Sequence, residues 1–195
     1  RPDDEDPPRV VSKAGRGRVG DRASAGSYTR RGAALMGTLE KQCLGASRAL
    51  NSAGNVVITG NNYAQHDAPD STVHVYEWQG AAWEIRGSEL NVGATGKEYG
   101  TAVAISGSGA TIAIGERGEG HLHNRVESYD WEGNAAWVAR DVLRGSTSLA
   151  SKFGSAVALS EDGKVLAVGE PGWTNAQSGN GKEGRVYVYS WDAEA

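Results

Sequence analysis

Residues 99–116 read YGTAVAISGSGATIAIGE, and residues 153–170 repeat the pattern as FGSAVALSEDGKVLAVGE. A more diverged copy, LGASRALNSAGNVVITGN, occupies residues 44–61. The second residue of each copy is a glycine, and these glycines are separated by 55 and 54 residues. A fixed period of this length is typical of small supersecondary units that bury their apolar faces only by stacking on one another. The sequence therefore predicts a repeat array.

Each repeat is predicted to contain four antiparallel strands. Alternating small and branched residues, as in 101–105, indicate a first strand, and a turn such as Glu161-Asp162-Gly163 leads to a second. A polar loop precedes a third strand that ends in Tyr-x-Trp, and a short turn leads to a more polar fourth strand that begins at Trp83 or Trp137. Such a unit is a β-propeller blade. The predicted fold class is all-β, with about three four-stranded antiparallel blades of roughly 54 residues in an incomplete ring.

The repeats divide the chain into blades and leave one strand over. We place blade 1 at about residues 44–91, blade 2 at about 92–145 and blade 3 at about 146–192. Residues 28–35 (YTRRGAAL) match the fourth strand at 83–90 (WEIRGSEL), so they are predicted to form an orphan outer strand. Blade 3 stops where its own fourth strand is expected to begin.

Three blades are too few to close a ring, because propellers contain about four to eight. The preferred interpretation is that the chain is part of a longer propeller, and its first residue, Arg1, fits a fragment or a processed product. A second interpretation is a homodimer, a six-bladed ring in which each orphan strand completes the partner's last blade. A third is an open stack of three blades.

Residues 1–27 form a charged leader that we expect to be disordered. An acidic cluster at 3–6 precedes an Arg-rich stretch in which Pro, Gly and Ser are interspersed, and large apolar residues are few. Such a segment buries too little apolar surface to offset its ordering entropy. It lacks the aromatic residues that stack on bases, so no nucleic-acid partner is expected. The chain has no apolar run of membrane-spanning length, and we expect no direct membrane insertion.

A two-part signature in each repeat resembles that of FG-GAP repeats, which form the blades of integrin α-subunit propellers and of many bacterial and algal surface proteins. The likeness covers about residues 28–192. Its copies are Phe153-Gly154 with Gly169-Glu170-Pro171, Tyr99-Gly100 with Gly115-Glu116-Arg117, and Leu44-Gly45 with Gly60-Asn61-Asn62. The resemblance implies a β-propeller within a larger extracellular or cell-surface protein, although a cytoplasmic location stays open. Calcium-binding members carry an Asp-x-Asp-x-Asp loop, which is absent here, so neither a metal site nor a cofactor is expected.

The loops between second and third strands, at 61–72, 116–125 and 170–185, differ in length and sequence and are expected on one rim. The sequence favours a non-enzymatic module that binds a protein or a glycan through these loops. Trp173 is an unrepeated aromatic residue in a polar loop, which is typical of a contact residue. The candidate contacts are Asn61, Asn62, Glu116, Arg117, Trp173 and Asn175.

Two other classes of function were weighed against binding. A polysaccharide-acting enzyme would use convergent carboxylates, and Glu116 and Glu170 recur at one blade position. Strand-end geometry copied from repeat to repeat explains this recurrence better than catalysis does. His121 and His123 have no third ligand at metal-binding spacing, so solvated loop histidines are expected there. A purely structural assembly module, with contacts at its edges, is the other alternative.

Overall fold

The computed structural model describes residues 27–37, 43–61, 71–91, 98–117, 124–133, 135–145, 151–175, 177 and 181–193. The chain divides into a first unit, residues 1–31, and a second unit, residues 32–195, which contains the twelve strands of the described residues. No helix among these residues has the length and apolar character needed to cross a membrane. The predicted all-β class is confirmed.

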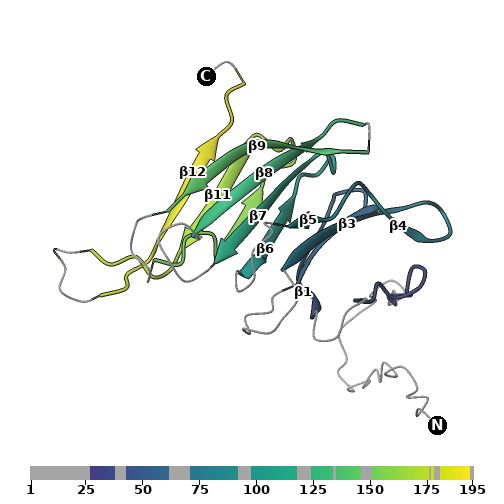
Figure 1. Cartoon of the computed structure of the whole chain (residues 1–195), viewed down its shortest axis with the longest axis horizontal. Helices are drawn as coiled ribbons and strands as arrows, with labels where there is room; N and C mark the ends of the chain where they lie inside the picture. The colour runs from purple at the N-terminus through teal and green to yellow at the C-terminus, as the bar shows by residue number, and fades with distance from the viewer. Residues whose placement is uncertain are drawn as a thin grey trace, which may run out of the picture. The chain divides into compact units, whose positions relative to one another are not determined.

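Three antiparallel sheets follow one another along the second unit, and we call them blades 1, 2 and 3 (Figure 1). Blade 1 has the order β1 (Leu44–Leu50), β2 (Val56–Asn61), β3 (Thr72–Trp78), β4 (Trp83–Ile85), with β5 (Leu90–Asn91) also beside β3. Blade 2 contains β6 (Glu98–Ile105), β7 (Thr111–Arg117), β8 (Arg125–Trp131) and β9 (Trp137–Arg144). Blade 3 contains β10 (Ala156–Leu159), β11 (Val165–Glu170) and β12 (Arg185–Ser190).

The strand register repeats from blade to blade. Trp78 lies opposite Trp83 across β3 and β4, and Trp131 lies opposite Trp137 across β8 and β9. Near the start of the first two blades the register shifts at a glycine, Gly45 or Gly100, whose φ angle is 89° or 79°. Positive φ is strained for residues with a Cβ, which explains why glycine occupies this position of the repeat.

The hydrophobic core lies between the blades. We call the face of each blade that is turned toward the next blade in sequence its back face, and the opposite face its front face. β1 and β2 pack against β6, and β10 packs against β6 and β7. The back face of blade 1 joins the front face of blade 2 in one buried cluster: Val56, Ile58, Val73, Val75, Tyr99, Val103, Ile105, Ile112, Ile114 and Trp137. A second cluster joins blades 2 and 3: Ala104, Ala113, Val126, Phe153, Leu166 and Val168. Both faces of blade 2 are therefore covered.

Neighbouring blades come closest at paired glycines. A Cβ atom on Gly60 would overlap the carbonyl oxygen of Gly100, and a Cβ on Gly115 would overlap that of Gly154. Gly169 holds the same position in blade 3, but a Cβ there would meet only Ala156, at 3.4 Å or more. The two interfaces are thus equivalent, and the back face of blade 3 has no described neighbour.

The expected outer strand at residues 28–35 is not formed. Residues 27–37 carry no strand, and among the described residues no strand pairs with them. A strand needs a hydrogen-bonded partner for its backbone groups, and the sequence match alone does not supply one. Blade 3 likewise has three strands, and within the described residues β12 pairs only with β11.

Replacing Gly115 with alanine is expected to destabilise the fold, because the new methyl group would collide with backbone that side-chain rotation cannot move. We expect Gly115→Ala to lower the free energy of unfolding by about 1–3 kcal/mol, the range for overpacking. Gly169→Ala is the matched control, expected within about 0.5 kcal/mol of the parent. Urea denaturation, at concentrations where the chain is monomeric, measures both. Equal effects at the two positions would contradict the glycine-pair interface.

Candidate binding site at the second-to-third strand loops

Each loop between a second and a third strand is closed at its base by a polar pair. In blade 1, Asn61 Nδ2 donates to Thr72 Oγ1 over 3.1 Å, and the Thr72 N–H donates to Asn61 Oδ1 over 2.5 Å. In blade 2, Arg125 Nε lies 2.6 Å from Glu116 Oε2. In blade 3, Arg185 Nε lies 2.6 Å from Glu170 Oε2. We call these three pairs the loop clasps.

The acidic or amide member of each clasp is buried. Asn61 is 1% exposed, and Glu116 and Glu170 are 0% exposed. Two predicted ligand contacts, Asn61 and Glu116, therefore lie inside the protein, and their polar atoms are used to hold strand ends together. The sequence did contain a signal for this role, since an arginine follows each glutamate at the start of the next strand.

A wider polar network surrounds the clasp of blade 2. Arg125 Nη2 also lies 2.8 Å from Glu127 Oε1. The hydroxyls of Tyr129 and Tyr99 donate to Glu127 Oε2 over 2.6 Å and 3.1 Å. Burial, followed by the hydrogen bond to Glu127, raises the pKa of Tyr129 to about 12, and burial raises the pKa of Tyr99 further. Both tyrosines thus stay neutral donors to a buried carboxylate.

The clasp of blade 3 carries an aromatic stack. The Arg185 guanidinium lies over the ring of Trp173 at 4.7 Å and over that of Tyr187 at 4.7 Å. Tyr187 contacts Phe153 edge-on and stacks with Tyr189. The Arg185 side chain is 32% exposed, compared with 17% for Arg125, so the clasp of blade 3 is the more open of the two ion pairs.

The two arms of the blade 3 loop are held together beyond the clasp. The Gly184 N–H donates to the Trp173 carbonyl over 3.0 Å, and the Lys182 N–H donates to Thr174 Oγ1 over 3.1 Å. The Asn175 N–H donates to Glu183 Oε2 over 2.9 Å. These bonds extend the hairpin beyond Glu170 and Arg185, where β11 ends and β12 begins, and hold the Trp173 backbone in place.

Of the remaining predicted site residues, the structure describes Arg117 but not Asn62 or the two loop histidines. Arg117 forms a two-pronged contact with Glu98, at 2.8 Å and 3.2 Å, and its side chain is 41% exposed. Asn62, His121 and His123 lie outside the described residues. No group of three or more His, Cys, Asp or Glu side chains that could hold a metal ion occurs within the described part of the chain.

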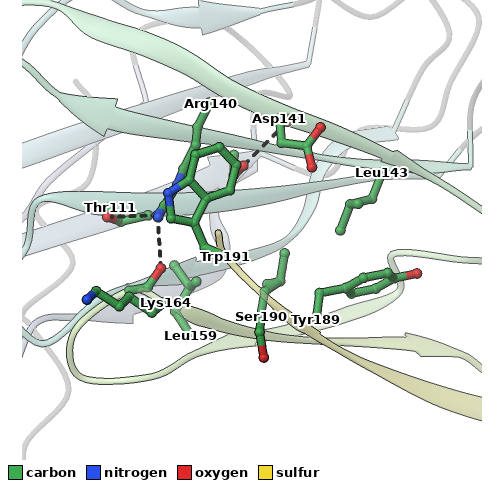
Figure 2. Close-up of a pocket in the computed structure, with 12 residues that line it drawn as sticks. Thr111, Arg140, Asp141, Leu143, Leu159, Lys164, Tyr189, Ser190 and Trp191 are labelled. Atoms are coloured by element: carbon green, nitrogen blue, oxygen red, sulfur yellow. Dashed lines mark hydrogen bonds between the residues drawn. The ribbon is translucent and has the colours of Figure 1, made fainter. Parts of the chain in front are cut away.

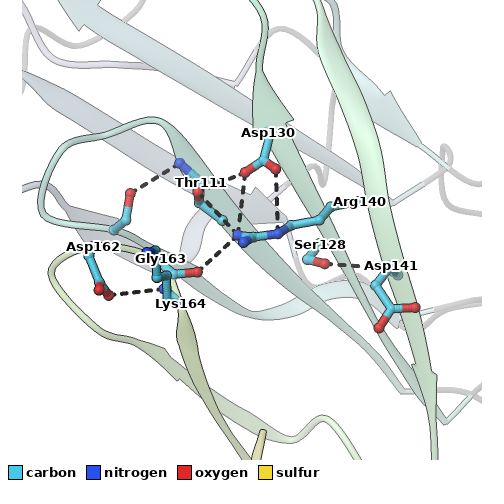
Figure 3. A network of polar contacts seen from close by, with 9 residues as sticks. Thr111, Ser128, Asp130, Arg140, Asp141, Asp162, Gly163 and Lys164 are labelled. Atoms are coloured by element: carbon cyan, nitrogen blue, oxygen red, sulfur yellow. Dashed lines mark hydrogen bonds and ion pairs between the residues drawn. The ribbon is translucent and has the colours of Figure 1, made fainter. Parts of the chain in front are cut away.

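A cavity of about 100 Å³ lies at the boundary between blades 2 and 3 (Figure 2). Arg140, Asp141 and Leu143 line it from β9, and blade 3 contributes mainly Leu159, Leu166, Tyr189 and Trp191. Arg140 is fixed at the edge of the cavity by the Gly163 carbonyl at 2.9 Å and by Asp130 (Figure 3). The Arg140 guanidinium also lies over the Trp191 ring at 4.1 Å (Figure 2). No pattern in the sequence indicates this cavity.

Comparison with known proteins supports the fold alone. No protein-family profile matches the chain. No curated protein matches it either. Among solved structures, Atg21 in the complex of KlAtg21 with the coiled coil of AgAtg16 has a TM-score of 0.52 and 13% identity, over 75% of this chain and 40% of that one. A putative 6-phosphogluconolactonase from Bacteroides uniformis has a TM-score of 0.47 and 12% identity, over 76% of this chain and 37% of that one. This chain thus spans about 40% of the Atg21 chain, which is propeller-like, and its fold is a set of propeller blades.

Removing a buried clasp residue is expected to destabilise the protein, because it leaves a partly buried arginine without its closest counter-charge. Glu116→Ala is expected to lower the free energy of unfolding by about 3 kcal/mol, the lower end for a broken buried pair, since Arg125 keeps Glu127. Glu132→Ala, at an exposed turn, is expected to change it by less than about 0.5 kcal/mol. Chemical denaturation compares them. A Glu116→Ala effect as small as that of the control would show that the clasp is not structural.

Alkaline pH is expected to destabilise blade 2. A tyrosine whose folded pKa is raised stabilises the fold fully below its unfolded pKa of about 10, and that contribution is lost as pH rises through the folded value. For Tyr129 the window runs from about 10 to about 12. Urea unfolding at pH 9 and pH 11 should show a larger loss for the parent than for Tyr129→Phe. An equal loss in both proteins would contradict the assignment.

Proposed function

We propose that this chain is a non-enzymatic β-propeller binding module that holds a protein or glycan ligand against its second-to-third strand loops, within a larger extracellular or surface protein. The observation that carries the proposal is the repeated clasp at the base of every such loop. Three loops of unlike sequence leave corresponding strand ends of three stacked blades, and each is anchored by a buried polar pair.

Anchored loops are suited to binding. A loop that is already held in its bound conformation loses little conformational entropy when a ligand docks, so more of the contact energy appears as affinity. The described arms of the blade 3 loop meet this condition, because their backbone bonds fix both sides of the loop as far as Asn175 and Lys182. Sequence can then vary beyond the clasp while the blade below stays unchanged.

The blade 3 loop offers the best-defined contact surface. Trp173 and Arg185 present a half-buried indole beside a partly exposed guanidinium, with the amide of Asn175 close along the chain. Tryptophan and arginine provide large contact areas at binding sites, and an indole face also stacks on sugar rings. The propeller-like Atg21 chain is found in a complex with a coiled coil, which adds support for a protein ligand.

The geometry gives less support to the enzyme alternative. The two recurring carboxylates, Glu116 and Glu170, are fully buried, and each is ion-paired with an arginine at 2.6 Å. A general acid and base for glycoside hydrolysis must instead reach the substrate from opposite sides of the scissile bond. Binding through the loops requires no rearrangement of these pairs.

The test is a screen of the purified chain against a glycan array and a peptide array, followed by affinity measurement on any hit. We expect Trp173→Ala to weaken binding by about 30-fold, as for a hot-spot residue. Gln177→Ala, on the same loop, is the control and should bind like the parent. A hit whose affinity is unchanged by Trp173→Ala would contradict the assignment of this loop, and the absence of any hit would contradict the proposed ligand classes.

A further inference from the structure

The cavity lies between blades 2 and 3, and the corresponding position between blades 1 and 2 is filled by side chains. Its walls from blade 3 include Leu159, Leu166, Tyr189 and Trp191. The repeat places Ile105, Ile112, Tyr129 and Trp131 at the same positions of blade 2. Ile105 and Ile112 belong to the buried cluster between blades 1 and 2, and Tyr129 and Trp131 pack against it. That cluster also includes Trp137, at the start of the fourth strand.

Between blades 1 and 2, the position that corresponds to the cavity is filled by Trp137 of the fourth strand. Its side chain is buried, with the residue 8% exposed, and its ring centroid lies 5.0 Å from that of Trp131. Its Nε1 donates to the Arg86 carbonyl over 2.9 Å. In blade 3, β12 pairs only with β11 within the described residues, so no described side chain takes the place of Trp137 beside the cavity (Figure 2).

The chain contains an aromatic residue of the required type. Residues 28–35 match the fourth strands residue by residue, and Tyr28 stands where Trp83 and, by the same repeat, Trp137 begin theirs. A fourth strand follows its own third strand within about six residues, yet residues 17–23 (GRVGDRA) have none of the third-strand pattern. Tyr28 is fully exposed. Residues 28–35 therefore need a third strand from elsewhere, and β12 has one edge that pairs with no other strand among the described residues.

The back face of blade 3 and the front face of blade 1 are both uncovered in the described part of the chain, and each could cover the other. On the back face of blade 3, Val186 and Val188 are 68% and 69% exposed, whereas their counterparts Val73 and Val75 are 0% and 2% exposed. At the front of blade 1, no atom of the described part of the chain lies within 4 Å of a Cβ on Gly45, although its counterparts Gly100 and Gly154 each abut the preceding blade. Repeating the Gly60–Gly100 and Gly115–Gly154 contacts once more would pair Gly169 with Gly45.

The segment that contains Gly32 already runs where a preceding blade would place its fourth strand. A Cβ on Gly32 would lie 2.7 Å from the Trp78 ring and 3.5 Å from the Trp83 ring. Gly87 stands in the same relation to Trp131 and Trp137, at 2.9 Å from each. A blade docked on the front of blade 1 would therefore meet the segment that begins at Gly32 at its own outer edge.

We propose that two copies of this chain form a six-bladed ring in which residues 28–35 of each copy become the fourth strand of blade 3 of the other, with Tyr28 filling the cavity between blades 2 and 3. Its hydroxyl can donate to the Arg140 carbonyl as Trp137 Nε1 does to Arg86. One chain cannot close on itself, since three blades are too few for a ring. A two-fold axis makes both junctions identical.

Sedimentation equilibrium of the full 195-residue chain over a concentration series tests the proposal, with Tyr28→Ala, Tyr28→Trp and Thr29→Ala as variants. We expect a parent dimer of twice 20.4 kDa. Because each dimer buries two copies of Tyr28, Tyr28→Ala should raise the dimer dissociation constant by at least about 100-fold. Tyr28→Trp should preserve the dimer, and so should Thr29→Ala, which replaces the neighbouring residue that corresponds to the exposed Glu84.

A second variant examines the opposite side of the junction. Gly169→Ala leaves the fold of one chain undisturbed but places a methyl group where the second copy's Gly45 must approach, so it should also abolish the dimer. A parent that stays monomeric at every concentration, as expected if further blades come from a longer protein, would overturn the proposal. So would open-ended association, or a dimer that tolerates both Tyr28→Ala and Gly169→Ala.

Discussion

The backbones of neighbouring blades meet where the second strand of one blade touches the first strand of the next, and only a residue without a side chain fits there. Gly60 and Gly115 occupy these points, and each abuts the carbonyl of a glycine that has positive φ. This contact fixes the distance and register between blades. The apolar clusters can close on either side of it only because the sheets are held so near to each other.

The two ends of each blade are stabilised by different contacts. At the loop end, buried pairs such as Glu116 with Arg125 close the strands below sequences that vary freely. At the opposite end, an arginine on the fourth strand lies over the tryptophan of the next blade, as Arg86 does on Trp131 and Arg140 on Trp191. The first arrangement anchors the loops at their bases, and the second holds consecutive blades together at their outer edges.

Much of this could be predicted from sequence, because alternation and turn glycines are local signals that each repeat carries in phase. The burial of Glu116 could not, since recurrence of a carboxylate at a strand end does not show which way it points. Its partner Arg125 was the informative residue. The outer strand expected at 28–35 is not formed in the single chain, because strand formation depends on a partner and not on the segment alone. The cavity beside Trp191 could not be predicted from the sequence, because its walls come from β9 and from blade 3, and only the packing of the two blades brings them together.

The central claim is that β12, which pairs only with β11 among the described residues, gains a fourth strand from a second copy of the chain. The Trp191 N–H bonds to Lys164 of blade 3, so by alternation the amides of Val186, Val188 and Ser190 point to the open edge. Hydrogen exchange at these three amides, followed as a function of protein concentration, tests the claim most directly. The account predicts protection that grows with concentration and is lost on dilution, while Ser128, paired with β9, stays protected throughout. Fast exchange at all three amides at every concentration would contradict it.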